Sequence, residues 1–146
     1  MTVKAGTGRL LAGRPVSGGA QRRFPAGPDS VGLVRAFVAA EMSGFARVDD
    51  VVLCASELAA NAVRHGSVRG DVYEVVVHRR RGGAYVEVID SGGAGVPVLR
   101  DAGAFAEGFR GLALVGACAS AWGWSRDEGG GCRVWCEVAM RGAGVD

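Results

Sequence analysis

Two strand patterns joined by a short loop constrain the fold of this chain more than any other feature of its sequence. Val72–His78 (VYEVVVH) and Ala84–Asp90 (AYVEVID) are both rich in β-branched and aromatic residues. The loop between them, Arg79–Gly83, ends in two glycines. Strands this close in sequence pair as an antiparallel hairpin. The fold must therefore contain an antiparallel sheet.

The segments around this hairpin predict two helices before it, and a helix and two strands after it. A stripe of apolar residues predicts a helix that follows Pro28-Asp29-Ser30 and ends near Met42. Asp49 or Asp50 is expected to cap a second helix that runs to His65. The other expected elements are a short edge strand at Gln21–Ala26, an apolar helix at Gly111–Ala121, and strands at Trp122–Asp127 and Cys132–Met140.

The order of these elements predicts the fold class. Helices and antiparallel strands are grouped in the sequence rather than alternating strictly. The prediction is an α+β fold, a two-layer sandwich in which a mixed, mainly antiparallel sheet carries helices on one face. The length of 146 residues suits one domain, and no internal repeat is evident. The glycine-rich ends, residues 1–20 and 141–146, are expected to be disordered tails around a domain at 21–140.

Charge and apolar patterning argue against several classes of protein. The net charge of +2 is too small to indicate a nucleic-acid binder. The arginine runs Arg22-Arg23 and Arg79–Arg81 are interpreted as solvated strand ends rather than as a phosphate-binding patch. No apolar run approaches the ~20 residues of a membrane span, and no signal peptide is evident. We therefore expect no direct contact with nucleic acid or with a membrane.

The four cysteines indicate a reduced, cytoplasmic protein. They include no C-x-x-C pair, and with only two histidines in the chain they do not predict a zinc site. Cys54 and Cys118 lie in apolar helical patterns, where a buried thiol is the usual state. Cys132 and Cys136 share one side of a predicted strand but are too far apart to form a disulfide.

The second predicted helix contains the segment LCASELAANAVRHGS, in which Glu57, Asn61 and His65 form a polar stripe beside an apolar one. A solvated polar face is the simpler interpretation. In the functional interpretation, the Glu57 carboxylate takes a proton from an attacking hydroxyl and the Asn61 amide oxygen binds magnesium. His65 is either a polar residue at the helix end or a phosphate contact.

The strand Ala84–Asp90 leads into a glycine-rich break in the segment VEVIDSGGAG. Asp90 there is either part of an ordinary turn or a nucleobase contact, in which its carboxylate accepts a hydrogen bond from an exocyclic amine. The phosphate-loop pattern G-x-x-x-x-G-K-[S/T] is absent, and the glycines lack the spacing of a dinucleotide-binding fingerprint.

Gly108 and Gly111 stand directly before the apolar helix pattern that follows. They either start a helix after a loop or expose helix N–H groups to an anion. Arg110 between them is placed for a phosphate contact, but an exposed arginine is equally ordinary there. The preceding loop, which begins near Val96, is long for a compact domain, and loops of that length are often functional.

The order of these segments resembles the Bergerat-type ATP-binding fold that gyrase, Hsp90, histidine kinases and MutL share. More closely, it resembles the anti-sigma-factor serine/threonine kinases of the partner-switching type. ELAANAVRHG resembles that family's N-box, VIDSGGAG its first glycine box and GFRGLALV its second. Two positions depart from the pattern. Ala94 stands where the family often has a glycine, and Arg133 is assigned to the place of a threonine near the adenine.

The resemblance implies a role for each matching residue. Glu57 would be the general base, Asn61 would hold Mg²⁺ on the phosphates of ATP, and Asp90 would accept from the adenine amine. Val96–Glu107 would form the lid over the nucleotide. The remaining implied contacts to ATP are Gly92, Gly95, Gly108, Arg110, Gly111 and Leu112.

The same resemblance implies a regulatory function. The protein would phosphorylate a serine or threonine of a STAS-type anti-sigma-factor antagonist, sequester a sigma factor and form a homodimer. Two alternatives stay open. One is a module of the same fold that binds ATP or protein without transferring phosphate, and the other is a detached histidine-kinase catalytic domain. Glu57 in the N-box favours the serine/threonine kinase pattern.

Overall fold

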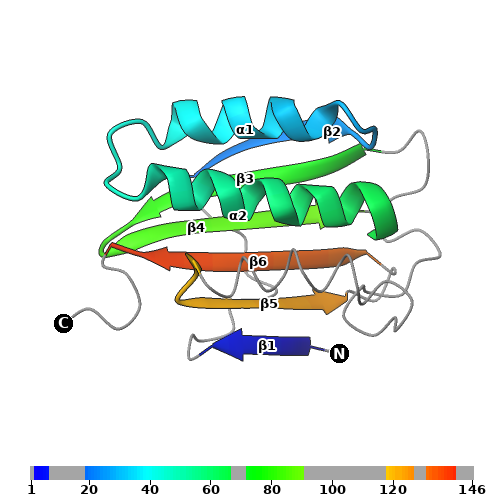
Figure 1. Cartoon of the computed structure of the whole chain (residues 1–146). Coiled ribbons are helices and arrows are strands. Elements are labelled where there is room, and N and C mark those ends of the chain that lie inside the picture. Colours follow the sequence, from blue (N-terminus) through cyan, green and yellow to red (C-terminus); the bar gives the residue numbers. More distant parts are fainter. Residues whose placement is uncertain (1, 7–18, 67–71, 91–117, 127–130, 141–146) are drawn as a thin grey trace.

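A computed structural model describes residues 2–6, 19–66, 72–90, 118–126 and 131–140 (Figure 1). These residues form an α+β sandwich, in which two helices pack on one face of a six-stranded sheet. The strands follow the order β1-β5-β6-β4-β3-β2 across the sheet. Their bounds are β1 Thr2–Gly6, β2 Ala20–Pro25, β3 Val72–Arg80, β4 Gly83–Asp90, β5 Ala121–Arg126 and β6 Cys132–Ala139.

The predicted hairpin is confirmed as the β3–β4 pair. It runs from the pairing of Arg80 with Gly83 at the turn to the pairing of Tyr73 with Asp90 at the open end. Gly82 has a φ of +84°, a backbone conformation that L side chains rarely adopt. A side chain at Gly83 would collide with the carbonyl oxygen of Val138. Both turn glycines are therefore required by the geometry of the hairpin.

Two helices, α1 at Ser30–Glu41 and α2 at Val48–Asn61, lie side by side over one face of the sheet (Figure 1). The expected cap of α2 is wrong, because Arg47 occupies the N-cap position. Asp49 and Asp50 lie in the first helical turn, where their negative charge interacts favourably with the helix dipole. The Asp50 carboxylate accepts a 2.8 Å hydrogen bond from Arg47 Nε instead.

The core lies between this helical layer and the sheet. Alternate residues of strands β2 to β6 point toward the helical layer, and apolar side chains occupy most of these positions. Cys54 and Cys136 are buried there as free thiols. Core residues that are at most 1% exposed include Val34, Val38, Met42, Val51, Leu58, Tyr73, Val75 and Val86.

The opposite face of the sheet has a smaller apolar cluster and a buried ion pair. The rings of Tyr85 and Trp135 stack with their centroids 6.3 Å apart, and both side chains are fully buried. Next to them in the strands, Arg133 Nη1 donates to Glu87 Oε2 over 3.1 Å. Glu87 is only 2% exposed, so this carboxylate is neutralised inside the protein rather than by water.

The α+β sandwich with helices on one face is confirmed, with two differences from the sequence prediction. Each strand pair that the structure describes is antiparallel, so the mixed component of the predicted sheet is not found there. Residues 1–20 are not simply a tail, because Thr2–Gly6 forms β1 beside Ala121–Ser125 of β5. Backbone pairing holds this strand, and backbone pairing leaves little trace in side-chain patterns.

Within the described residues, no helix combines the length and the apolarity that crossing a membrane requires. Most of the predicted helix Gly111–Ala121 lies outside the described residues, and its last residue, Ala121, is the first residue of β5. The strands predicted at Trp122–Asp127 and Cys132–Met140 are confirmed to within one residue at each end.

Candidate functional site

Helix α2 carries the first two candidate residues. Its apolar stripe, which includes Val51, Cys54 and Leu58, is fully buried against the sheet and fixes the rotation of the helix. Glu57 is half-buried and has no hydrogen-bond or ion-pair partner among the described residues. Asn61 is only 6% exposed, and its Oδ1 has no hydrogen-bond partner in the part of the chain that the structure describes.

A buried amide oxygen without a partner carries a free-energy cost that native structures usually avoid. Such a group indicates either strain or a ligand that satisfies the oxygen when bound. An amide oxygen is a hard, neutral ligand of the type that Mg²⁺ accepts alongside water and phosphate oxygens. The chemistry of Asn61 therefore fits a magnesium ion held on a nucleotide.

The backbone changes its helical geometry directly after Asn61. Residues Ala62–Gly66 form a π-helical turn, where the sequence predicted an α-helix as far as His65. A π-helical turn widens the helix by one residue and is frequent at functional sites. Glycine at position 66 was recognised as a helix end, but no sequence pattern distinguished the wider turn. The His65 side chain lies outside the described residues.

Asp90 is the last residue of β4 and points to the helical face of the sheet. Strand alternation places it on the same side as Ala84, Val86 and Val88, which pack in the main core. Asp90 is 6% exposed. A carboxylate this deep, at the end of a strand and facing the helical layer, is suited to recognise a hydrogen-bond donor that enters between the two layers.

The fold brings Asn61 and Asp90 to the same end of the sheet. Helix α2 and strand β4 run in the same direction, so their C-terminal ends lie together in Figure 1. The π-helical turn after Asn61 also contacts β4. We call this end of the sandwich, defined by Asn61 and Asp90, the nucleotide end, after the ligand that the sequence resemblance implies for these two residues. The β3–β4 turn marks the opposite end.

Arg133 is not part of this site, which corrects its sequence-based assignment near the adenine. It pairs with Ile89 on β4, and its guanidinium binds Glu87 on the other face of the sheet. The residue that pairs with Asp90 is Cys132. Alternation along β6 puts Cys132 and Cys136 on the helical face, so the predicted common side of these cysteines is confirmed.

Tyr73, which the sequence did not single out, lies next to Asp90. Tyr73 pairs with Asp90 across the β3–β4 hairpin, and its hydroxyl lies 2.6 Å from the Ser30 hydroxyl at the start of α1. Burial raises the pKa of Tyr73, and the hydrogen bond to Ser30 lowers it by less. Tyr73 therefore stays a neutral phenol that joins α1 to the sheet beside Asp90.

The remaining predicted site residues lie outside the described residues. This holds for the lid segment Val96–Glu107 and for the predicted ATP contacts Gly92, Gly95, Gly108, Arg110, Gly111 and Leu112. Among the described residues, no group of three or more His, Cys, Asp or Glu side chains could hold a metal ion. A metal at the nucleotide end would therefore take part of its ligand set from phosphate and water, which is usual for magnesium.

Comparison with known proteins gives one result. The family model for the histidine kinase-like ATPase domain matches residues 24–136, which include both Asn61 and Asp90. A search of curated proteins finds no match.

Proposed function

Because this chain belongs to the histidine kinase-like ATPase family, a family of ATP-binding domains, we propose that it is an anti-sigma-factor serine/threonine kinase. The observation that carries the proposal is the buried Oδ1 of Asn61, which has no hydrogen-bond partner among the described residues and lies one helical turn beyond Glu57. A base and a magnesium ligand four residues apart on one helix are the two protein groups that phosphoryl transfer from Mg-ATP requires most.

Each residue acts through position and charge. The Asn61 amide oxygen holds the magnesium ion, which neutralises charge on the transferring phosphoryl group. The Asp90 carboxylate accepts a hydrogen bond from the adenine amine and fixes the base. Glu57 is half-buried and has no ion-pair partner in the described part of the chain, so its carboxylate can accept the proton of a serine or threonine hydroxyl. With reactants held in line, little covalent chemistry is needed from the protein.

The partners follow from the resemblance to partner-switching kinases. The acceptor hydroxyl belongs to a STAS-type anti-sigma-factor antagonist, and the unphosphorylated antagonist competes with a sigma factor for the kinase. Phosphorylation releases the antagonist, and the kinase then sequesters the sigma factor. We propose that this exchange takes place in the cytoplasm between protein partners, without direct contact with DNA, and that the kinase acts as a homodimer.

Calorimetric titration of the chain with ATP, with and without Mg²⁺, tests the nucleotide site. We expect saturable binding that Asp90→Asn reduces at least about 100-fold, because the adenine amine loses a charged acceptor in a buried site. Asn61→Ala is expected to remove the magnesium dependence of the affinity. Glu41→Gln, an exposed carboxylate substitution on α1, serves as the matched control. Absence of ATP binding by the wild type would contradict the proposal.

Phosphoryl transfer requires a separate test with labelled ATP and an antagonist protein. Glu57→Gln is expected to keep ATP affinity within about threefold and to slow transfer by about 100-fold or more, the usual contribution of a general base. If the wild type binds ATP but transfers no phosphate, the chain is the non-catalytic ATP-binding module. If Glu57→Gln transfers phosphate at the wild-type rate, Glu57 is not the base.

A further inference from the structure

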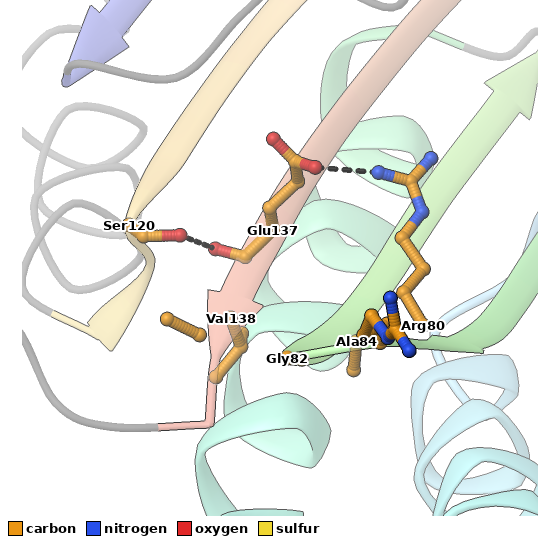
Figure 2. Close-up of a pocket in the computed structure, with 9 residues that line it drawn as sticks. Arg80, Gly82, Ala84, Ser120, Glu137 and Val138 are labelled. Carbon is orange, nitrogen blue, oxygen red and sulfur yellow. Dashed lines mark hydrogen bonds and ion pairs between the residues drawn. The ribbon is translucent and has the colours of Figure 1, made fainter.

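A small pocket lies at the turn of the β3–β4 hairpin, and we call it the hairpin-end pocket (Figure 2). It has a volume of about 130 Å³. The turn, the residue before β5 and the end of β6 each contribute to its wall. Its lining residues are Arg80, Arg81, Gly82, Gly83, Ala84, Ser120, Glu137, Val138 and Ala139.

Arg80 is held in place at this pocket. Its Nη1 lies 2.5 Å from Glu137 Oε2, and its guanidinium carbon lies 4.5 Å from the centre of the Tyr85 ring. Figure 2 shows the Arg80 and Glu137 side chains pointing toward each other, while the Ser120 hydroxyl binds the Glu137 carbonyl oxygen. A guanidinium has five N–H donors, so binding Glu137 leaves others for a further acceptor. Arg80 is therefore a pre-oriented donor rather than a freely moving surface side chain.

Arg81 adds a second cation beside it. It lies in the turn, is exposed, and makes no hydrogen bond or ion pair with any residue that the structure describes. Its neighbour Arg79 points to the other face, where it donates to the Ser43 carbonyl. The run Arg79–Arg81, interpreted from the sequence as a solvated strand end, is therefore only partly solvated. Arg79 and Arg80 bind groups within the chain, and Arg81 is left available.

The charges of the pocket define what it can bind. Its lining contains two cations, Arg80 and Arg81, and one anion, Glu137, which leaves one net positive charge. One carboxylate balances that charge, whereas a phosphate dianion would exceed it. The small volume fits the end of a single side chain, because small-molecule sites usually measure about 300 Å³ or more.

We propose that the hairpin-end pocket docks an acidic segment of a partner protein, with one Asp or Glu carboxylate of that segment bound between Arg80 and Arg81. The site is distinct from the nucleotide end. Strand β4 separates the two over eight residues, which corresponds to about 25 Å. An acidic partner can therefore occupy the pocket without displacing a nucleotide.

Fluorescence anisotropy with the full chain tests this docking site. The probe is a fluorescein-labelled peptide of glutamates spaced by glycine and serine, and its glutamine counterpart is the neutral control. We expect the glutamate peptide to bind and Arg81→Gln to weaken it at least about fivefold. Arg23→Gln, an exposed arginine on β2 away from the pocket, should leave the affinity unchanged.

A gain of binding separates docking from a loss of structure. Glu137→Gln removes the internal competitor for Arg80 and raises the net charge of the pocket, so it should strengthen peptide binding at least about threefold. Three results would overturn the proposal: equal binding of the glutamine peptide, equal weakening by Arg23→Gln and Arg81→Gln, and displacement of the peptide by Mg-ATP. Each is independent of whether the chain transfers phosphate.

Discussion

At the hairpin end of the sheet, Arg47, Arg79 and Arg80 each bind an acceptor that the chain itself supplies. At the nucleotide end, by contrast, the Asn61 amide oxygen is buried with no hydrogen-bond partner among the described residues. The first arrangement contributes to the stability of the folded chain. The second carries a cost that a bound ligand can remove. The two ends therefore differ in how far the described part of the chain satisfies its own polar groups.

The largest effect is expected behind the nucleotide end, on the other face of the sheet. Arg133→Gln leaves the carboxylate of Glu87, which is 2% exposed, without its cation. Loss of one partner of a buried pair typically costs about 3–5 kcal/mol, so the free energy of unfolding at neutral pH should fall by that amount. Urea unfolding measures it, with Arg23→Gln as the exposed control. An equal loss in both variants would contradict the assignment.

The same pair gives a pH dependence of known sign. Burial raises the pKa of Glu87 above its ordinary value of 4.5, and the hydrogen bond and charge of Arg133 oppose that rise. A carboxyl with a raised folded-state pKa stabilises the fold below its ordinary value and loses that contribution as the pH rises through the raised pKa. The cost of Arg133→Gln should therefore grow from acid toward neutral pH. A cost independent of pH would contradict this account, because it would show that Glu87 binds its proton equally in the folded wild type and the folded variant.

The next largest effect belongs to the hairpin end. Arg47 donates to the carbonyl oxygens of Ala139 and Cys118, at 2.9 and 3.0 Å, and also pairs with Asp50. Arg47→Ala removes the hydrogen bonds that connect the start of α2 to the end of β6 and to the segment before β5. We expect the free energy of unfolding to fall by about 2–4 kcal/mol. ATP affinity, measured in parallel on the folded variant, should change little.

The nucleotide end should respond in the opposite way. Asn61→Leu replaces an amide whose buried Oδ1 has no partner among the described residues by an apolar group of similar size, so the free energy of unfolding should rise by up to about 2 kcal/mol. The magnesium dependence of ATP binding should be lost in the same variant. A clear loss of stability would mean that the amide is satisfied in the free protein, and the contrast between the two ends would then fail.

The smallest effect is expected for Arg80→Gln. Its pair with Glu137 is shorter than the pair of Arg133 with Glu87, 2.5 Å against 3.1 Å, but both of its side chains are a quarter or more exposed. Pairs in which both side chains are partly exposed contribute about 0.5–1 kcal/mol and are screened by salt. The unfolding free energy should fall by that amount at low salt and by less at high salt. A larger loss than for Arg133→Gln would reverse the order argued from burial.

The sequence predicted the fold class and its central hairpin well, because both depend on local patterns. Alternation in Val72–His78 and Ala84–Asp90, with glycines in the turn, leaves few other arrangements. The resemblance implied that Asn61 and Asp90 both contact ATP, and therefore that they lie at the same end of the sheet. The structure supports it through the parallel courses of α2 and β4.

The features that the sequence did not predict depend on register and on pairing between distant segments. The face of the sheet on which Arg133 lies depends on the register of β6, and a shift of one residue in register moves every side chain to the other face. The alternation of Cys132, Val134 and Cys136 toward the core was the sequence feature that could have indicated that Arg133 faces the other side of the sheet. The π-helical turn and strand β1 left no comparable pattern, since both are set by backbone hydrogen bonds.

The strand order also has a consequence for biosynthesis. The two edge strands, β1 and β2, precede the other described strands in the chain, so their pairing partners are synthesised after them. β2 can pair only after Val72–Arg80 has been synthesised, and β1 can pair only after Ala121–Arg126 has been synthesised. Pairing between such distant segments is slow, because a long loop must close first. During translation the sheet therefore grows outward from the β3–β4 hairpin, and the strand that is made first is among the last to be placed.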